Sequence, residues 1–202
     1  KKIKIFSTPF SIDGVDFLEN LNTKIYKVSS FEMNDLNLVK RIALTKKPMI
    51  ISTGLASLKE IERTVLTARK YGCKDLTLLY CVSNYPSNDN DLNLNNIEIL
   101  KKKFKCRVGL SDHSIGSNIA CLAISKGAEV IEKHIYLKNI NSVDSKFSLR
   151  ADEVNKFIIK INTTKKITQN KKFIRSKAEL KNKIFRRSIF AVKDIKKGEE
   201  FT

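Results

Sequence analysis

The sequence predicts an α/β fold in which a parallel sheet forms a (β/α)8 barrel that lacks its first two βα units. Short apolar runs alternate regularly with amphipathic helical patterns, as in chains of βα units. Most runs are apolar on both faces, which is typical of strands covered by helices. Polar residues follow every run. A doubly wound sheet, the competing architecture, would gather them at one switch point and carry a Gly-rich phosphate loop, which the sequence does not contain.

The expected strands are six apolar runs, at 3–6, 24–28, 48–51, 76–82, 107–110 and 129–134. Helical patterns occupy the segments between and after them, at 14–21, 35–43, 57–72, 94–104, 116–125 and 151–163. The third helix shows the clearest signals, because Ser57 and Glu60 can form a capping box and Gly72 follows the last turn. The chain is therefore expected to run as six βα units.

The domain organisation follows from a change in composition near residue 163. Residues 1–163 are predicted to form the partial barrel, and residues 164–185 a polar, Lys-rich linker. A new strand pattern at 188–192 precedes a turn and Gly198. Residues 186–202 are therefore predicted to begin a small β-rich domain.

The charge and the cysteines narrow the class of protein. The net charge is +18, but only 8 of the 39 basic residues are Arg, and no basic helix with interleaved aromatics appears. This favours a solvated Lys-rich surface that steers small anions over a nucleic-acid partner. No apolar run approaches the ~18 residues that a membrane helix needs. The four cysteines lack metal-type spacing and are expected to be free thiols in the cytoplasm.

The strand ends carry the candidate chemistry. Hydroxyls at Thr8, Ser30, Ser52 and Ser111, together with Lys27, suit a phosphate, which is bound by several donors and one cation. The alternative interpretations are purely structural. Ser30 and Ser52 could only cap helices, and Lys27 could lie on the surface.

The chain contains only two histidines, and both lie at the ends of predicted strands. His113 and His134 stand beside the carboxylates Asp112 and Glu132 and suit a divalent ion of the Mn, Fe, Co or Zn group. Two strand-end histidines can also arise by chance. Lys133 is expected to point outward from its strand.

Seven motifs in order resemble those of the sialic acid synthase family, which condenses phosphoenolpyruvate with an amino sugar. They are FSTPF (6–10), YKVSSFE (26–32), KPMIISTG (47–54), LLYCVSNYP (78–86), VGLSDHS (108–114), GAEVIEKH (127–134) and RRSIFAVKDIKKGE (186–199). The resemblance implies a (β/α)8 barrel followed by a small antifreeze-like (SAF) domain. It also implies a homodimer for the full-length protein.

The resemblance further implies a role for each matching residue. The phosphate of phosphoenolpyruvate would lie on Thr8, Lys27, Ser30, Ser52 and Ser111. A divalent ion, Mn2+ or Mg2+, would be held by His113 and His134. The amino sugar would contact Glu32, Tyr85, Asp144 and the Ser83–Asn84 pair. Lys27, Glu32 and the two histidines would be the catalytic set.

Two features resemble the pseudaminic acid branch of the family rather than the neuraminic or legionaminic branches. They are Phe31, where other branches usually have Gly, and 143-VDSKFSL-149, although Val143 stands where Pro is usual. Two other interpretations stay open. One is a Schiff-base aldolase that uses Lys27 or Lys133. The other is an inactive fragment, because the family takes a catalytic Glu and a sugar-binding Arg from outside these residues, so that the 202 residues alone are expected to show little turnover.

Overall fold

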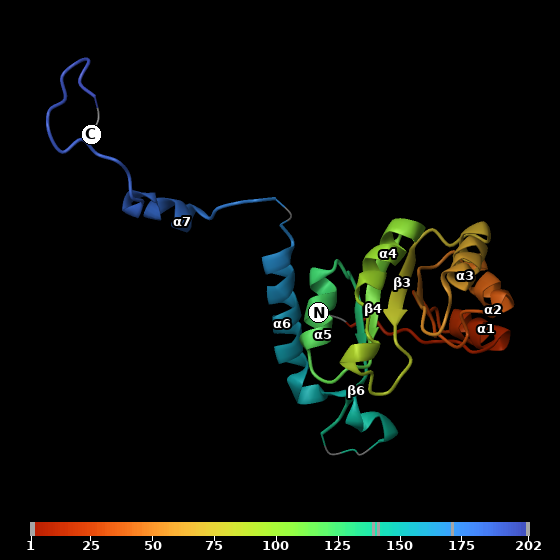
Figure 1. Cartoon of the computed structure of the whole chain (residues 1–202). Helices are drawn as coiled ribbons and strands as arrows, with labels where there is room; N and C mark the ends of the chain where they lie inside the picture. Colours follow the sequence, from red (N-terminus) through yellow and green to blue (C-terminus); the bar gives the residue numbers. More distant parts are fainter. Residues whose placement is uncertain (1–2, 139, 141, 171, 201–202) are drawn as a thin grey trace. The chain divides into compact units, whose positions relative to one another are not determined.

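The computed structural model describes residues 3–138, 140, 142–170 and 172–200. It divides the chain into two compact units, residues 1–169 and residues 170–202 (Figure 1). The first unit contains all the strands that the structure describes and all the predicted site residues. The second contains the short helix α7 (Lys177–Lys181) and the 3-10 turn η4 (Asn182–Phe185).

A five-stranded parallel sheet organises the first unit. Its strands are β1 (Tyr26–Val28), β2 (Met49–Ser52), β3 (Leu76–Cys81), β4 (Arg107–Asp112) and β5 (Ile131–Lys133), paired in the order of the sequence. A doubly wound sheet would reverse its strand order at a switch point, and this sheet does not. The sheet curls as half of a barrel, which confirms the predicted α/β class and its parallel topology.

A helix follows each strand or bridge, as the alternating pattern predicted. The helices are α1 (Ile12–Asn20), α2 (Leu36–Leu44), α3 (Leu58–Lys70), α4 (Asn95–Phe104), α5 (Asn118–Ser125) and α6 (Val154–Thr168). The capping box of Ser57 and Glu60 is present at the start of α3. Helix α6 packs against α5 (Figure 1) and continues to Thr168, so it occupies the first residues of the predicted linker.

Two predicted strands are wrong. Segment 3–6 is not a strand, because the chain reaches the sheet only at Ser7, which forms an isolated bridge with Tyr26. Segment 188–192 is also not a strand, and Ile189 is fully exposed. Both segments have strand-like composition, but a strand needs a partner for its backbone groups. The SAF domain therefore remains a prediction.

The loop after β5 contains elements that the sequence pattern did not predict. Strands β6 (Ile135–Tyr136) and β7 (Leu149–Arg150) pair in parallel, and the 3-10 turn η2 (Val143–Lys146) lies between them. Two further 3-10 turns are η1 (Asp89–Asp91) and η3 (Ala151–Glu153). The β6–β7 pair brings η2 back toward the end of β5, where His134 lies.

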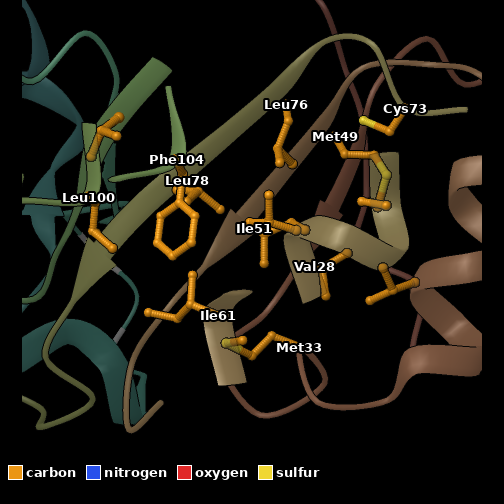
Figure 2. Close-up of a cluster of buried hydrophobic side chains, with 14 of the residues drawn as sticks. Val28, Met33, Met49, Ile51, Ile61, Cys73, Leu76, Leu78, Leu100 and Phe104 are labelled. Atoms are coloured by element: carbon orange, nitrogen blue, oxygen red, sulfur yellow. The ribbon is translucent and has the colours of Figure 1, made fainter. Parts of the chain in front are cut away.

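The core fills the space between the sheet and its helices. Val28, Ile51 and Leu78 of three neighbouring strands face Ile61 of α3 and Phe104 of α4 (Figure 2). Each such side chain contributes about 1.5 to 3 kcal/mol on burial. The first unit therefore has enough buried apolar surface to hold its strand ends in fixed positions.

Gly109 sets how closely β4 and β5 approach. A Cβ at this position would lie 2.2 Å from the carbonyl oxygen of Val130, which is backbone and cannot move aside. Only glycine therefore permits this spacing. Close approach of these strands matters because the two histidines follow them directly. Elsewhere, no helix of the described residues is long and apolar enough to cross a bilayer, and all four cysteines are free thiols.

Candidate active site

A pocket of about 370 Å³ opens at the carboxyl ends of the parallel strands. This is the end at which β/α barrels carry their active sites. The pocket brings together eight of the predicted site residues, namely Thr8, Lys27, Ser30, Ser52, Tyr85, Ser111, His113 and His134. The sequence pattern therefore identified most of its lining.

Lys27 provides a buried positive charge in the pocket. Its ammonium donates to the carbonyl oxygen of Val28 at 3.1 Å and lies 3.6 Å from a carboxylate oxygen of Glu132. Burial lowers the pKa of Lys27, and the nearby Glu132 only partly opposes this. Glu132 does not fully stabilise the charged form of Lys27, so a second anion bound in the pocket would stabilise it further.

The hydroxyls around Lys27 are placed to donate to such an anion. Ser52 is only 2% exposed, and its Oγ has no hydrogen-bond partner among the described residues. Ser30 Oγ accepts from the backbone N–H of Gly54 at 3.0 Å. A Cβ at Gly54 would lie 2.8 Å from Ser30 Oγ and 2.2 Å from Ser83 Oγ, so only glycine leaves these hydroxyls in place. An unpartnered buried hydroxyl costs free energy unless a ligand pairs with it.

The two imidazoles lie side by side, with ring centroids 5.4 Å apart. His113 Nδ1 is 2.9 Å from the carbonyl oxygen of Val82, and because a carbonyl only accepts, this nitrogen carries the proton. His134 Nδ1 lies 3.4 Å from a carboxylate oxygen of Asp144, which also only accepts. Nε2 of each ring is therefore left to bind a metal, and the pair fits a divalent ion held by two protein ligands. Within the described residues, no group of three or more His, Cys, Asp or Glu side chains has metal-binding geometry.

The ring of His113 also contacts a thiol. Burial disfavours its charged form, but hydrogen bonds with Cys81 Sγ and the Val82 carbonyl outweigh burial and raise the pKa of His113. Burial likewise raises the pKa of Cys81, but hydrogen bonds from His113 and Ser30 outweigh it, so that the pKa of this thiol is lowered overall. No sequence signal indicates that Cys81 lines the pocket, because this residue ends an otherwise apolar strand.

Aromatic side chains form the outer wall. The ring centroids of Tyr85 and His113 are 4.1 Å apart. The ring centroid of Phe147 lies 5.2 Å from those of both Tyr85 and His134. A second hollow of about 590 Å³ adjoins the pocket, with Phe31, Tyr85 and His134 lining both. Val143, Asp144, Lys146 and Phe147 line only the second hollow, which we call the outer hollow.

Some predicted residues lie outside the pocket. Glu32 accepts a hydrogen bond from Ser29 and lines neither hollow. Ser83 also lies outside the lining, with its hydroxyl 3.7 Å from Cys81 Sγ. Asn84 donates to Asp91 in the neighbouring loop at 3.4 Å. Asp144 lies in the outer hollow rather than in the pocket.

Lys133 points away from the face of Glu132, as alternation along β5 predicts, but it does not reach solvent. Its side chain is 5% exposed and forms an ion pair with Asp112, whose side chain is 0% exposed. Ser111 and Glu132 share the pocket face of the β4–β5 ladder, so Asp112 and Lys133 share the other face, where they contact each other. A buried Asp112 would have required a cationic partner, and Lys133 lies opposite it in register.

Fold and pocket together define a class, a parallel half-barrel whose strand ends bring a buried lysine, several hydroxyls and two adjacent imidazoles into one pocket. The model of the NeuB family matches residues 1–173, and the chain belongs to this family.

Named relatives are similar over nearly the whole chain. The pseudaminic acid synthase of Campylobacter jejuni subsp. jejuni serotype O:2 is 43% identical over 99% of this chain and 59% of its own length. An N,N'-diacetyllegionaminic acid synthase of the same organism is 42% identical over 99% of this chain and 61% of its own length. The chain therefore spans about three fifths of the length of these relatives.

A solved structure shows the same fold. The N-acetylneuraminic acid synthetase of Leptospira borgpetersenii superposes with a TM-score of 0.83 at 33% identity, over 91% of this chain and 65% of that protein. A DAHP synthase of Thermotoga maritima, at 15% identity and a TM-score of 0.69, shares the fold alone.

Proposed function

We propose that this chain forms the phosphoenolpyruvate- and metal-binding part of an enzyme that condenses phosphoenolpyruvate with an amino sugar. The product is a nonulosonic acid, with pseudaminic acid favoured, and phosphate is released. One observation carries the proposal. The buried ammonium of Lys27 and the unpartnered hydroxyl of Ser52 line the same pocket as the paired imidazoles of His113 and His134.

Phosphoenolpyruvate fits the buried side of this pocket. Its phosphate would accept hydrogen bonds from Lys27 and from the hydroxyls of Thr8, Ser30, Ser52 and Ser111. These are the donors that a phosphate needs, and they come from rigid strand ends. Ser111 Oγ donates to Glu132 at 2.7 Å, so it would have to turn toward the phosphate. The donors would hold the enol carbon in a fixed orientation toward the acceptor.

His113 and His134 would hold the divalent ion, Mn2+ or Mg2+. When bound, this ion supplies Lewis-acid polarisation of the sugar aldehyde. The protein's part is to orient the rings, which Val82 and Asp144 do at Nδ1.

The reaction balances without a covalent enzyme intermediate. Carbon 3 of phosphoenolpyruvate forms a bond to the aldehyde carbon, whose oxygen takes up a proton. Water adds at carbon 2, where positive charge has developed. The carbon–oxygen bond to phosphate then breaks, which leaves a ketone and inorganic phosphate.

The amino sugar would lie in the outer hollow. Phe31 and Val143 are 66% and 92% exposed and present apolar surface beside the carboxylate of Asp144. An exposed apolar wall suits a 6-deoxy sugar, which has a methyl group where other sugars have a hydroxymethyl group. Tyr85 and Asp144 would contact the sugar directly. Glu32 would need a rotation away from Ser29 to do so.

The Schiff-base aldolase is the second candidate, because the pKa of Lys27 is lowered as a nucleophilic lysine requires. Lys133 does not qualify, since its ammonium donates to both Asp112 and the Ser114 carbonyl. Borohydride trapping of a carbonyl substrate on Lys27 would support this candidate. Metal-dependent phosphate release would exclude it.

The remaining parts of the proposal concern the complete protein. We propose that it is a cytoplasmic homodimer and that residues 186–202 begin an SAF domain. The similarity of 186-RRSIFAVKDIKKGE-199 to the family motif supports that domain. If essential groups lie outside these residues, the 202 residues alone should release little phosphate.

A hybrid enzyme tests the proposed function. The hybrid is the Campylobacter jejuni pseudaminic acid synthase with this chain in place of the segment that it matches. Phosphate release would be measured with the acetamido sugars that lead to pseudaminic, legionaminic and neuraminic acids, with and without a chelator. We expect chelator-sensitive release that is fastest with the pseudaminic precursor. Phosphate release that the chelator does not inhibit, or that occurs without a sugar, would contradict the proposal.

A further inference from the structure

A buried ion pair joins the two strands that carry the imidazoles. The β4–β5 ladder ends with Asp112 opposite Lys133. His113 follows the first of these residues and His134 follows the second. The side chains that close the ladder are therefore attached directly to the residues whose spacing the metal requires.

Lys133 contacts the chain on both sides of His113. Its Nζ lies 2.7 Å from Asp112 Oδ2 and donates to the carbonyl oxygen of Ser114 at 2.6 Å. Asp112 Oδ1 in turn accepts from the N–H and the Oγ of Ser114, at 2.9 and 2.6 Å. The residues before and after His113 are thus fixed to each other and to the residue before His134.

Stability alone does not explain this pair. Removing an ammonium and a carboxylate from water costs free energy that their attraction often fails to return, and apolar residues of similar size are often as stable or better. The two groups nevertheless lie almost fully buried beside the pocket. Apolar side chains at these two positions would avoid this desolvation cost. A role of the Asp112–Lys133 pair in fixing the geometry of the strand ends explains why the charged pair is present.

Other contacts orient each ring separately. The Val82 carbonyl fixes His113, and Asp144 fixes the ring of His134. Neither contact sets the position of one strand end relative to the other, whereas the Asp112–Lys133 pair does. We propose that Asp112 and Lys133 are positioning residues that hold the two imidazoles at the spacing required to bind one divalent cation. This inference rests on the metal site of the proposed function.

The test compares four forms of the 202-residue chain, the fourth being the conservative variant Lys133→Arg. The first is the wild type. The second is the double variant Asp112→Asn/Lys133→Met, which removes both charges and keeps both volumes. The third is the control Lys101→Met/Glu129→Gln, which removes an exposed ion pair that joins α4 to the residues just before β5. Urea unfolding of each form shows that it folds.

Two readouts would be taken on each form. Mn2+ binding would be followed by electron paramagnetic resonance, and the two imidazoles by nitrogen-15 NMR without metal. We expect the double variant to bind Mn2+ about 10- to 100-fold more weakly, with altered imidazole signals, although its unfolding midpoint stays near that of the wild type. The control should match the wild type in both readouts. The conservative variant Lys133→Arg should recover part of the affinity.

The outcomes separate this inference from the proposed function. Wild-type Mn2+ affinity and unchanged imidazole signals in the double variant would overturn the positioning role while leaving the metal site intact. If the wild type itself fails to bind Mn2+, the metal assignment of the proposed function fails. In that case the metal-free imidazole signals decide, since altered signals in the double variant support positioning and unchanged signals refute it.

Discussion

The pocket and the outer hollow adjoin each other, yet they are built differently. Lys27, Ser52 and His113 of the pocket are buried and belong to, or directly follow, strands of the sheet. Phe31 and Val143, which line the outer hollow, are exposed and lie outside the sheet, in the turn after β1 and in η2. Rigid strand ends suit a substrate that every member of a family shares, whereas loops suit the part that differs. This difference supports the proposal that phosphoenolpyruvate binds in the pocket and that the outer hollow sets the specificity for the sugar.

The largest expected effect is the loss of either imidazole. His113→Ala and His134→Ala in the hybrid should each lower phosphate release about a thousandfold or more, because Lewis-acid stabilisation provides several kcal/mol. Lys101→Met is the control, since Lys101 pairs with Glu129 on the surface and should leave the rate unchanged. Full activity of either histidine variant would contradict the proposed role of His113 and His134 as metal ligands.

The next effect concerns the phosphate. Lys27→Met should weaken phosphoenolpyruvate binding about 10- to 100-fold, the magnitude of a lost charge-assisted contact. Ser52→Ala should weaken it about fivefold. Isothermal titration would measure both, and the affinity for the sugar should not change. A selective loss of sugar binding in Lys27→Met would reverse the assignment of the two regions.

A smaller effect is expected in the outer hollow. Phe31→Gly should reduce the preference of the hybrid for a 6-deoxy sugar over its 6-hydroxy counterpart about tenfold, because a methyl group gains about 1 to 3 kcal/mol on an apolar surface. The KM for phosphoenolpyruvate should stay constant. If that KM rises while the sugar preference persists, the two regions are not separate in function.

The smallest expected effect is that of Lys27→Met on stability. This variant should weaken phosphoenolpyruvate binding but raise the free energy of unfolding. Burial holds the pKa of Lys27 below its ordinary value, so the folded protein loses this proton at a lower pH than the unfolded chain does. Stability should therefore rise with pH from the folded-state pKa up to about 10.4. At neutral pH, Lys27→Met should raise the free energy of unfolding by about 1 kcal/mol, since Glu132 keeps partial contact with solvent.

Urea unfolding at pH 7 and at pH 10 measures this. The advantage of Lys27→Met over the wild type should shrink at the higher pH, because the folded wild type releases the proton of Lys27 at a lower pH than the unfolded chain does. Lys24→Met is a suitable control, because Lys24 is exposed and should show no such dependence. A variant less stable than the wild type at pH 7 would show that Lys27 is a structural residue rather than a functional one.

The sequence predicted the pocket better than the outer hollow, for a physical reason. Parallel strands end at one edge, so polar residues after each apolar run converge, and Lys27, Ser52 and His113 could be placed together without a structure. The burial of Lys133 could not, because its partner Asp112 lies on another strand and only the register of β4 and β5 brings the two side chains together. Segments 3–6 and 188–192 show that strand propensity alone does not supply a partner.

The outer hollow had no comparable signal. Strands β6 and β7 have two residues each, too few for any periodicity. The contact of Phe147 with the His134 ring depends on how this pair returns the chain to the end of β5. Asp144 was assigned to the sugar from a motif, and its 3.4 Å approach to His134 became visible only in three dimensions.

Relaxation of the phosphorus nucleus of phosphoenolpyruvate by Mn2+ bound to the chain tests the central claim most directly, because it requires the phosphate and the metal to occupy one pocket. We predict strong phosphorus-31 line broadening with the wild type, which is lost in His113→Ala and greatly reduced in Lys27→Met. Broadening that persists unchanged in both variants would contradict the account, since the phosphate and the ion would then bind elsewhere.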